Sequence, residues 1–213
     1  KQENFQKALE IDESSNAARI NSGFIRLIKK DWTRGFKDLE ARLNDPTLSQ
    51  IQTNLSCPMW NGSDLRGKSI LIYPEQGFGD TINYFRFIEN ILELGGKVFF
   101  QSQPELLNLL SDSIKGVSIV GINDNIPKTD FFAPLMSLPH ILDIRSPSQI
   151  SGKPYLKSRD LTRQERELIR FQNKYVIGIN LSGSPEHTED YKRSINPNLL
   201  TDLNSISNIQ LVN

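Results

Sequence analysis

Apolar residues recur at helical spacing through the first part of the chain. Three apolar stripes follow one another, and a polar turn at Asp12–Ser15 separates the first two. A period of three to four residues is typical of a helix that packs one face against a core. The pattern therefore predicts helices throughout residues 1–43. The stripes comprise Phe5, Ala8, Leu9 and Ile11; Ala17, Ala18, Ile20, Gly23, Phe24, Leu27 and Ile28; and Trp32, Gly35, Phe36, Leu39 and Leu43.

From Lys68 onward, short apolar runs alternate with longer stretches of helical periodicity. Such alternation is typical of a parallel sheet with helices on both faces. Pro104 suits the first turn of a helix, and Gly95-Gly96 suits the end of one. The predicted strands are 69–73, 97–101, 117–120 and 130–134, and the predicted helices are 80–94, 104–114 and 137–143.

The remaining stretches divide the chain into predicted domains. Residues 46–67 contain turn-forming pairs such as Cys57-Pro58 without apolar periodicity, so they predict a linker or an extended crossing segment that Trp60 anchors to the sheet. A charged helix at 160–172 and a strand at 175–180 then predict a second α/β unit. It continues with a helix near 196–205 and a strand at 209–212. We expect a helical segment at 1–45, the linker at 46–67, a first Rossmann-like domain at 68–160 and the start of a second at 161–213.

Composition narrows the function classes. The 213 residues include 25 Lys+Arg and 25 Asp+Glu, so the net charge of zero argues against bulk binding to nucleic acid or acidic membranes. No apolar run is long enough to span a bilayer, and the first residues lack an apolar signal region. The single cysteine, Cys57, rules out an internal disulfide and a cysteine-rich zinc site. These features favour a soluble, cytoplasmic protein.

Both ends of the sequence resemble cuts. The chain begins without Met inside a predicted helix, and it ends on the apolar run Ile209–Asn213. We therefore expect a piece of a longer protein, with part of any active site missing.

The first candidate site is the loop 74–80, PEQGFGD, which follows the first predicted strand. Gly77 and Gly79 allow backbone N–H groups to approach a ligand closely, at the sheet edge where open α/β folds bind ligands. The spacing fits neither a phosphate loop nor a dinucleotide fingerprint, because no Gly-Lys-Ser/Thr follows and Ile82 replaces the third glycine. Asp80 has three interpretations: a helix cap, a cofactor hook or a catalytic base. A helix N-terminus would lower its pKa.

The second candidate site is the loop 179–195, INLSGSPEHTEDYKRSI. Backbone donors at Ser182 and Gly183 together with Lys192 and Arg193 would form an anion site near a helix start, and His187 lies between them. An ordinary solvated loop is the alternative. We predict no metal site, because the two histidines lack ligand spacing, and the absence of a Gly-x-Ser-x-Gly elbow argues against a hydrolase.

The helical part resembles a tetratricopeptide repeat. The segments KALEID and NAARINSGFIRLIKKDWTRGFKDLEARL resemble the end of one repeat and a complete second one. Ala8 and Gly35 have the spacing of small residues on successive helices in a repeat of about 34 residues. Glu13 and Arg19 depart from the usual Pro and Trp, and a generic helical hairpin is the alternative. Such a short array would lean on the next domain or continue upstream.

The order of all segments resembles bacterial tetratricopeptide-repeat proteins that carry a glycosyltransferase domain similar to family 9, the ADP-heptose:lipopolysaccharide heptosyltransferases. The typical motif Glu-Gln-Gly-x-Gly-Asp-Thr-Ile is matched by residues 75–82, with x at Phe78. The second motif is matched by Pro185, His187 and residues 193–195, whereas Ser184 and the run TEDYK depart from it.

The resemblance implies a GT-B fold of two Rossmann-like domains, the N-terminal one complete and binding the acceptor, the C-terminal one truncated and binding the donor. It implies an inverting, metal-independent transfer from a nucleotide-sugar donor, with no other cofactor, to a glycan, lipid-linked or protein acceptor. Asp80 would be the catalytic base, and the helical repeat could bind a protein partner. Two alternatives remain: a non-catalytic binding module with a degenerate transferase domain, and a nucleotide-sugar epimerase. The implied substrate-binding residues are Gln76, Gly77, Gly79, Thr81, Ser182, Gly183, His187, Lys192 and Arg193.

Overall fold

The computed structural model describes residues 2–48, 55–122, 124–160, 162–163, 166, 174–183 and 190–212. The chain forms two compact units, Lys1–Arg159 and Asp160–Asn213. The predicted helix at 160–172 lies largely outside the described residues. The helical segment and the first sheet share one unit.

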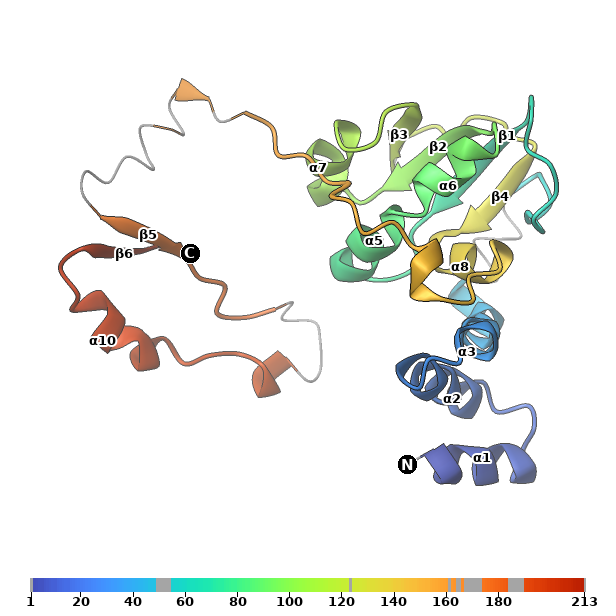
Figure 1. Cartoon of the computed structure of the whole chain (residues 1–213), viewed down its shortest axis with the longest axis horizontal. Coiled ribbons are helices and arrows are strands. Elements are labelled where there is room, and N and C mark those ends of the chain that lie inside the picture. Colours follow the sequence, from blue (N-terminus) through green and yellow to red (C-terminus); the bar gives the residue numbers. More distant parts are fainter. Residues whose placement is uncertain are drawn as a thin grey trace. The chain divides into compact units, whose positions relative to one another are not determined.

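The helical segment contains α1 (Gln2–Ile11), α2 (Asn16–Ile28), α3 (Trp32–Leu39) and the 3-10 helix η1 (Glu40–Asn44). The Ser15 side chain caps α2 by accepting the Ala18 N–H. Phe36 and Leu39 on α3 belong to the main core of the sheet, and Figure 1 shows α3 beside α8 (Leu138–Ile141). The helical segment therefore leans on the sheet, as its short length predicts.

Four parallel strands form the first sheet: β1 (Ser69–Tyr73), β2 (Lys97–Ser102), β3 (Val117–Gly121) and β4 (Phe131–Pro134). All four predicted strands are confirmed to within one residue at each end. Their spatial order is β3-β2-β1-β4. The chain therefore adds β2 and β3 on one side of β1, and then adds β4 on the other side of β1. This topology is consistent with a Rossmann-like α/β fold, and its switch point lies between β1 and β4.

Helices cover one face of this sheet. The main core joins strand residues such as Ile72 and Phe100 to α5 (Phe78–Phe85), α6 (Ile88–Glu93) and α7 (Leu107–Ser111), which lie together in front of the strands in Figure 1.

The opposite face carries a smaller core of Leu71, Tyr73 and Phe132. The described part of its cover is the extended segment around Leu55 and Met59, not a helix as the sequence predicts.

The anchoring role predicted for Trp60 is confirmed. Its side chain is 1% exposed, and its indole N–H donates to the Ser63 carbonyl at 2.9 Å. The Trp60 N–H donates to the Phe132 carbonyl, and the Phe132 N–H donates to the Pro58 carbonyl. Residues 58–60 therefore run alongside β4, and the segment predicted as a linker is part of the first unit.

The helices are shorter than the sequence predicts. The stretch 80–94 lies in two helices, α5 and α6, because Phe85, Phe87 and Ile88 are all buried. Their spacing does not fit one face of a continuous helix, so the chain turns between Phe85 and Ile88. The other two predicted helices begin as 3-10 turns, η2 (Pro104–Leu106) before α7 and η3 (Leu135–Ser137) before α8.

The second unit contains β5 (Tyr175–Gly178) and β6 (Ile209–Val212), which pair in parallel. Both strands were predicted. Between them lie η5 (Asp190–Lys192), η6 (Pro197–Leu200) and α10 (Thr201–Asn204), the last two dividing the helix predicted near 196–205.

Within the described parts of the chain, no helix is both long and apolar enough to cross a membrane.

Candidate functional site

The loop between β1 and α5 leaves open surface at the carboxyl end of the sheet. Gly77 is the N-cap of α5, with φ −65° and ψ 174°, and neither Gly77 nor Gly79 has a positive φ. A Cβ atom built at either position would meet nothing within 4 Å. Neither backbone conformation nor packing therefore requires glycine here. What the two glycines provide is access to the backbone.

Asp80 is the third residue of α5, behind the N-cap Gly77. No side-chain cap hydrogen bond is present at this helix, so the interpretation of Asp80 as the cap is wrong. Although the residue is exposed at the surface, burial of its carboxyl raises the pKa above the ordinary value of 3.8. This direction is opposite to the lowering expected from the helix dipole, and it makes the carboxylate a better proton acceptor.

Tyr84 follows Asp80 by one helical turn and is partly buried. Burial raises the pKa of its hydroxyl. The negative charges of Asp80, Glu75 and Glu40 raise this pKa further, whereas the positive charge of Arg42 lowers it. The phenol therefore stays protonated near Asp80. Sequence reasoning missed it, although residues four apart share a helix face.

Gln103 holds the loop from the side of β2. Its amide nitrogen donates to the Gln76 carbonyl at 3.1 Å and to the Thr81 hydroxyl at 2.9 Å. Thr81 is 1% exposed, so it holds the loop from beneath, away from the surface that a ligand would reach. The backbone of Gln76 is fixed by the same contact.

Arg42 reaches into the loop from the helical segment. Its Nε donates to Glu75 at 2.9 Å, and one terminal nitrogen donates to Glu75 at 3.2 Å and to the Ser137 hydroxyl at 2.8 Å. The other donates to the Leu39 carbonyl at 3.0 Å and to Glu40 at 2.7 Å. These contacts use all five N–H donors of a guanidinium. Arg42 therefore has no donor left for an anionic ligand.

The Arg42–Glu75 pair is shielded from solvent, with side chains 7% and 0% exposed. Burial raises the pKa of Glu75, whereas Arg42 and the Met136 N–H, at 2.9 Å, favour its charged form. Burial alone would lower the pKa of Arg42, but the charges of Glu75 and Glu40 raise it.

The pair fills the sheet's switch point. Glu75 follows β1, while Met136 and Ser137 follow β4, and these strands are neighbours. Ligands of open α/β sheets bind in the crevice at this position. Here Arg42 and Glu75 lie there, and the open surface of the loop is at the Gly77–Asp80 turn.

A cavity of about 540 Å³ lies beside the same loop. Two of its lining residues are joined by a hydrogen bond of 2.9 Å from the Asn44 amide to the Asn16 side chain. Besides the Arg42–Glu75 pair, the wall carries the Asp45 carboxylate, side-chain amides, a hydroxyl and aliphatic surface. The lining residues are Asn16, Ala17, Ile20, Ala41, Arg42, Asn44, Asp45, Pro46, Thr47, Leu48, Glu75 and Gln76.

In the second unit, Ser182, Gly183 and Arg193 share a pocket of about 270 Å³ with Asn180 and Leu181. The structure thus brings together three of the residues predicted for the second site. Lys192 is exposed, with its ammonium 5.6 Å from the centre of the Tyr191 ring. His187 lies outside the described residues.

Asp190 organises this second loop and was not predicted. Its carboxylate accepts the Gly183 N–H at 3.1 Å, Arg193 Nε at 2.8 Å and the Ser194 hydroxyl at 3.0 Å. The hydrogen bond from Arg193 is the main cause that lowers its pKa. The Gly183 N–H is therefore not available to a ligand. An acid three residues before Arg193 was the signal in the sequence.

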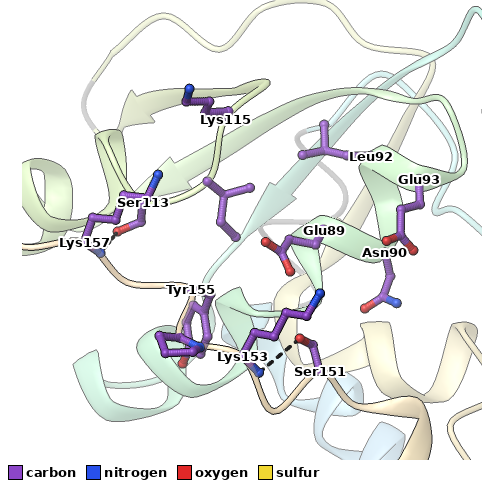
Figure 2. Close-up of a pocket in the computed structure, with 12 residues that line it drawn as sticks. Glu89, Asn90, Leu92, Glu93, Ser113, Lys115, Ser151, Lys153, Tyr155 and Lys157 are labelled. Carbon is purple, nitrogen blue, oxygen red and sulfur yellow. Dashed lines mark hydrogen bonds between the residues drawn. The ribbon is translucent and has the colours of Figure 1, made fainter.

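A third cavity, of about 530 Å³, lies on the helix-covered side of the first unit (Figure 2). It carries lysines and the carboxylates of Glu89 and Glu93, so charges of both signs face one groove. The strap at 151–157 forms one wall, fixed by a 2.7 Å hydrogen bond from the Tyr155 hydroxyl to the Ile82 carbonyl. None of the predicted site residues lines it.

Comparisons of the chain with protein-family models, with curated proteins and with solved structures give no match.

Proposed function

We propose that the protein is an inverting, metal-independent glycosyltransferase of the GT-B type with a tetratricopeptide-like helical segment. One observation carries the proposal: Asp80, with a raised pKa, stands at an open glycine turn beyond the carboxyl end of β1. Transfer to a hydroxyl needs a carboxylate that takes a proton at the moment of bond formation. A nucleotide sugar as donor fits a cytoplasmic location.

In the proposed reaction, the acceptor oxygen attacks the anomeric carbon of the donor from the face opposite the diphosphate. The new glycosidic bond forms as the bond to the diphosphate breaks, and Asp80 takes the hydroxyl proton. The departing diphosphate needs cationic or N–H donors to stabilise its charge, and Lys192 and Arg193 of the second unit are the proposed donor-binding residues. Tyr84, which follows Asp80 by one helical turn, is the proposed hydrogen-bond donor to the acceptor.

The proposal is tested first by thermal unfolding with nucleoside diphosphates and nucleotide sugars. A ligand at roughly 100 times its Kd should raise the Tm by about 5 to 10 °C. Loss of Arg193 in an Arg193→Ala variant should remove most of this shift. Stabilisation by none of the compounds contradicts the proposal.

The second test uses the Asp80→Asn variant with whichever donor binds. Loss of a general base should lower turnover about 100- to 10,000-fold, while donor binding stays within about threefold because Asp80 lies in the acceptor-side unit. Turnover close to that of the wild type would remove Asp80 from the chemistry.

A non-catalytic binding module is the second candidate function. Two observations favour it: Asp190 already holds Arg193, and the Arg42–Glu75 pair occupies the switch point. This candidate predicts nucleotide binding without turnover, and binding that does not depend on Asp80.

A further inference from the structure

We propose that Arg42 is a positioning residue, by which the helical segment holds the glycine-flanked loop and Asp80 in place. Its guanidinium fills the crevice between β1 and β4 in which open α/β sheets bind their ligands. The proposal concerns the conformation of the ligand-free loop, so it stands or falls independently of the sugar chemistry.

Three segments far apart in the chain meet at Arg42. It comes from η1, it is paired with Glu75 after β1 at 2.9 Å, and it donates to Ser137 after β4 at 2.8 Å. Glu40 closes the network by accepting the Ser137 hydroxyl at 2.8 Å. Arg42 thereby joins the two strand ends on either side of the crevice, in addition to the hydrogen bond from the Met136 N–H to Glu75.

Glu75 transmits this constraint to the loop. It directly precedes Gln76 and Gly77, the N-cap from which α5 and Asp80 follow. Its carboxylate is 0% exposed. Without Arg42 the charge would be buried and uncompensated, so it would have to take up a proton or move into water. Movement of Glu75 would carry the following turn outward with it.

The geometry calls for arginine specifically. A planar guanidinium places five donors in a fixed fork, whereas the ammonium of lysine has three on a flexible stem. Glu75, Glu40, Leu39 and Ser137 occupy all five. A lysine at position 42 would therefore keep the charge but could not bridge Glu75, Glu40, Leu39 and Ser137 at once, whereas the hydrogen bond from the Met136 N–H to Glu75 would remain.

The pKa of Asp80 reports on the position of the loop, because exposure of the loop and loss of a positive charge shift this pKa in opposite directions. Burial is what raises it, so a loop that moves into water should bring the pKa back down toward 3.8. Loss of a nearby positive charge, with Glu75 left uncompensated, would instead raise it. A fall that is accompanied by shifts of the Gly77 and Gly79 amide signals therefore indicates a changed loop position.

The experiment compares Arg42→Gln and Arg42→Lys with an Arg26→Gln control. Arg26 pairs with Asp38 at 2.6 Å inside the helical segment and does not reach the loop, so the control weakens that segment alone. The Asp80 carboxyl is titrated by NMR in each variant, and the amide signals of Gly77 and Gly79 are followed.

Both Arg42 variants should lower the pKa of Asp80 and shift the two glycine signals, while the control changes neither. An unchanged or raised pKa in a folded Arg42 variant overturns the proposal, as does full restoration by lysine. If Arg42→Gln does not fold, Ser137→Ala removes only one acceptor of the fork and should give the same changes with smaller amplitude. Unchanged signals in that variant would equally overturn the proposal.

Discussion

Two glycine pairs in this molecule serve opposite purposes. In the helical segment, a Cβ at Gly35 would lie 2.7 Å from Leu27 Cδ2, and one at Gly23 would lie 3.0 Å from the Gly35 carbonyl. In the loop after β1, a Cβ at Gly77 or Gly79 would meet nothing within 4 Å. The first pair lets α2 and α3 approach each other. The second pair keeps a surface clear, which a stable fold by itself does not require.

The comparison separates residues that stabilise the fold from residues kept for access. The contact between α2 and α3 is held by close packing within the helical segment. The loop is held by hydrogen bonds from Arg42 and Gln103, which belong to other segments. Its surface at Gly77 and Gly79 is left open. This division is what a ligand-binding turn requires, because the turn must be ordered before the ligand arrives.

The largest effect is expected for Gly35→Ala. The new Cβ overlaps Leu27, and overpacking of a closed contact costs about 1–3 kcal/mol, only partly offset by the better helix propensity of alanine. Urea unfolding with tryptophan fluorescence measures the loss. An unchanged free energy of unfolding would mean that α2 and α3 can move apart. Close packing would then not require glycine at position 35.

Gly79→Ala is the matched substitution on the other side. With open space around it and a position inside α5, alanine should leave the free energy of unfolding unchanged or raise it by up to about 1 kcal/mol. Turnover, or binding of whichever ligand the loop takes, should nevertheless fall about tenfold, because the methyl group blocks close approach to the backbone. Normal function in this variant would show that access to the turn is not needed.

The smallest change in stability is expected for Asp80→Ala. Loss of a helix cap would cost about 0.5–2 kcal/mol, but Asp80 is not the cap, so the change should stay within about 0.5 kcal/mol. Because burial raises its pKa, the folded state favours the protonated form. Asp80 therefore stabilises the wild type below pH 3.8, and this contribution is lost as the pH rises through the higher folded-state value.

Urea unfolding between pH 3 and 7 checks this sign. The difference between Asp80→Ala and wild type should move in favour of the variant as the pH rises, and then become constant. A difference that moves the other way would mean that the carboxylate is stabilised in the folded state, as a capping residue would be.

Sequence periodicity predicts the strands of this fold well, and the helices less so. The runs that form β1 and β6 are largely apolar and are bounded by polar residues or proline, so their limits are local properties. The division of 80–94 depends on Phe85 and Phe87 both being buried, which is decided by the sheet beneath them. The periodicity of residues 80–94 alone therefore cannot predict where the helix is divided.

The candidate site shows the same limit. Asp80 and the two glycines are visible as a motif because they lie within a few residues of one another. Arg42 and Glu75 belong to segments that only folding brings together. Glu75 is part of the same motif, but Arg42 alone resembles an ordinary surface charge. Asp190 lies two residues before the predicted Lys192, but its role depends on the Gly183 N–H as much as on Arg193.

The occupied switch point has a consequence for protein engineering. A sheet domain of this kind would ordinarily be treated as a module that can be excised or fused to another repeat. Here such a transplant would leave Glu75 without its partner and the crevice between β1 and β4 without its filling. Any chimera must therefore carry η1 across the junction, or replace the Arg42–Glu75 pair with apolar residues of similar volume.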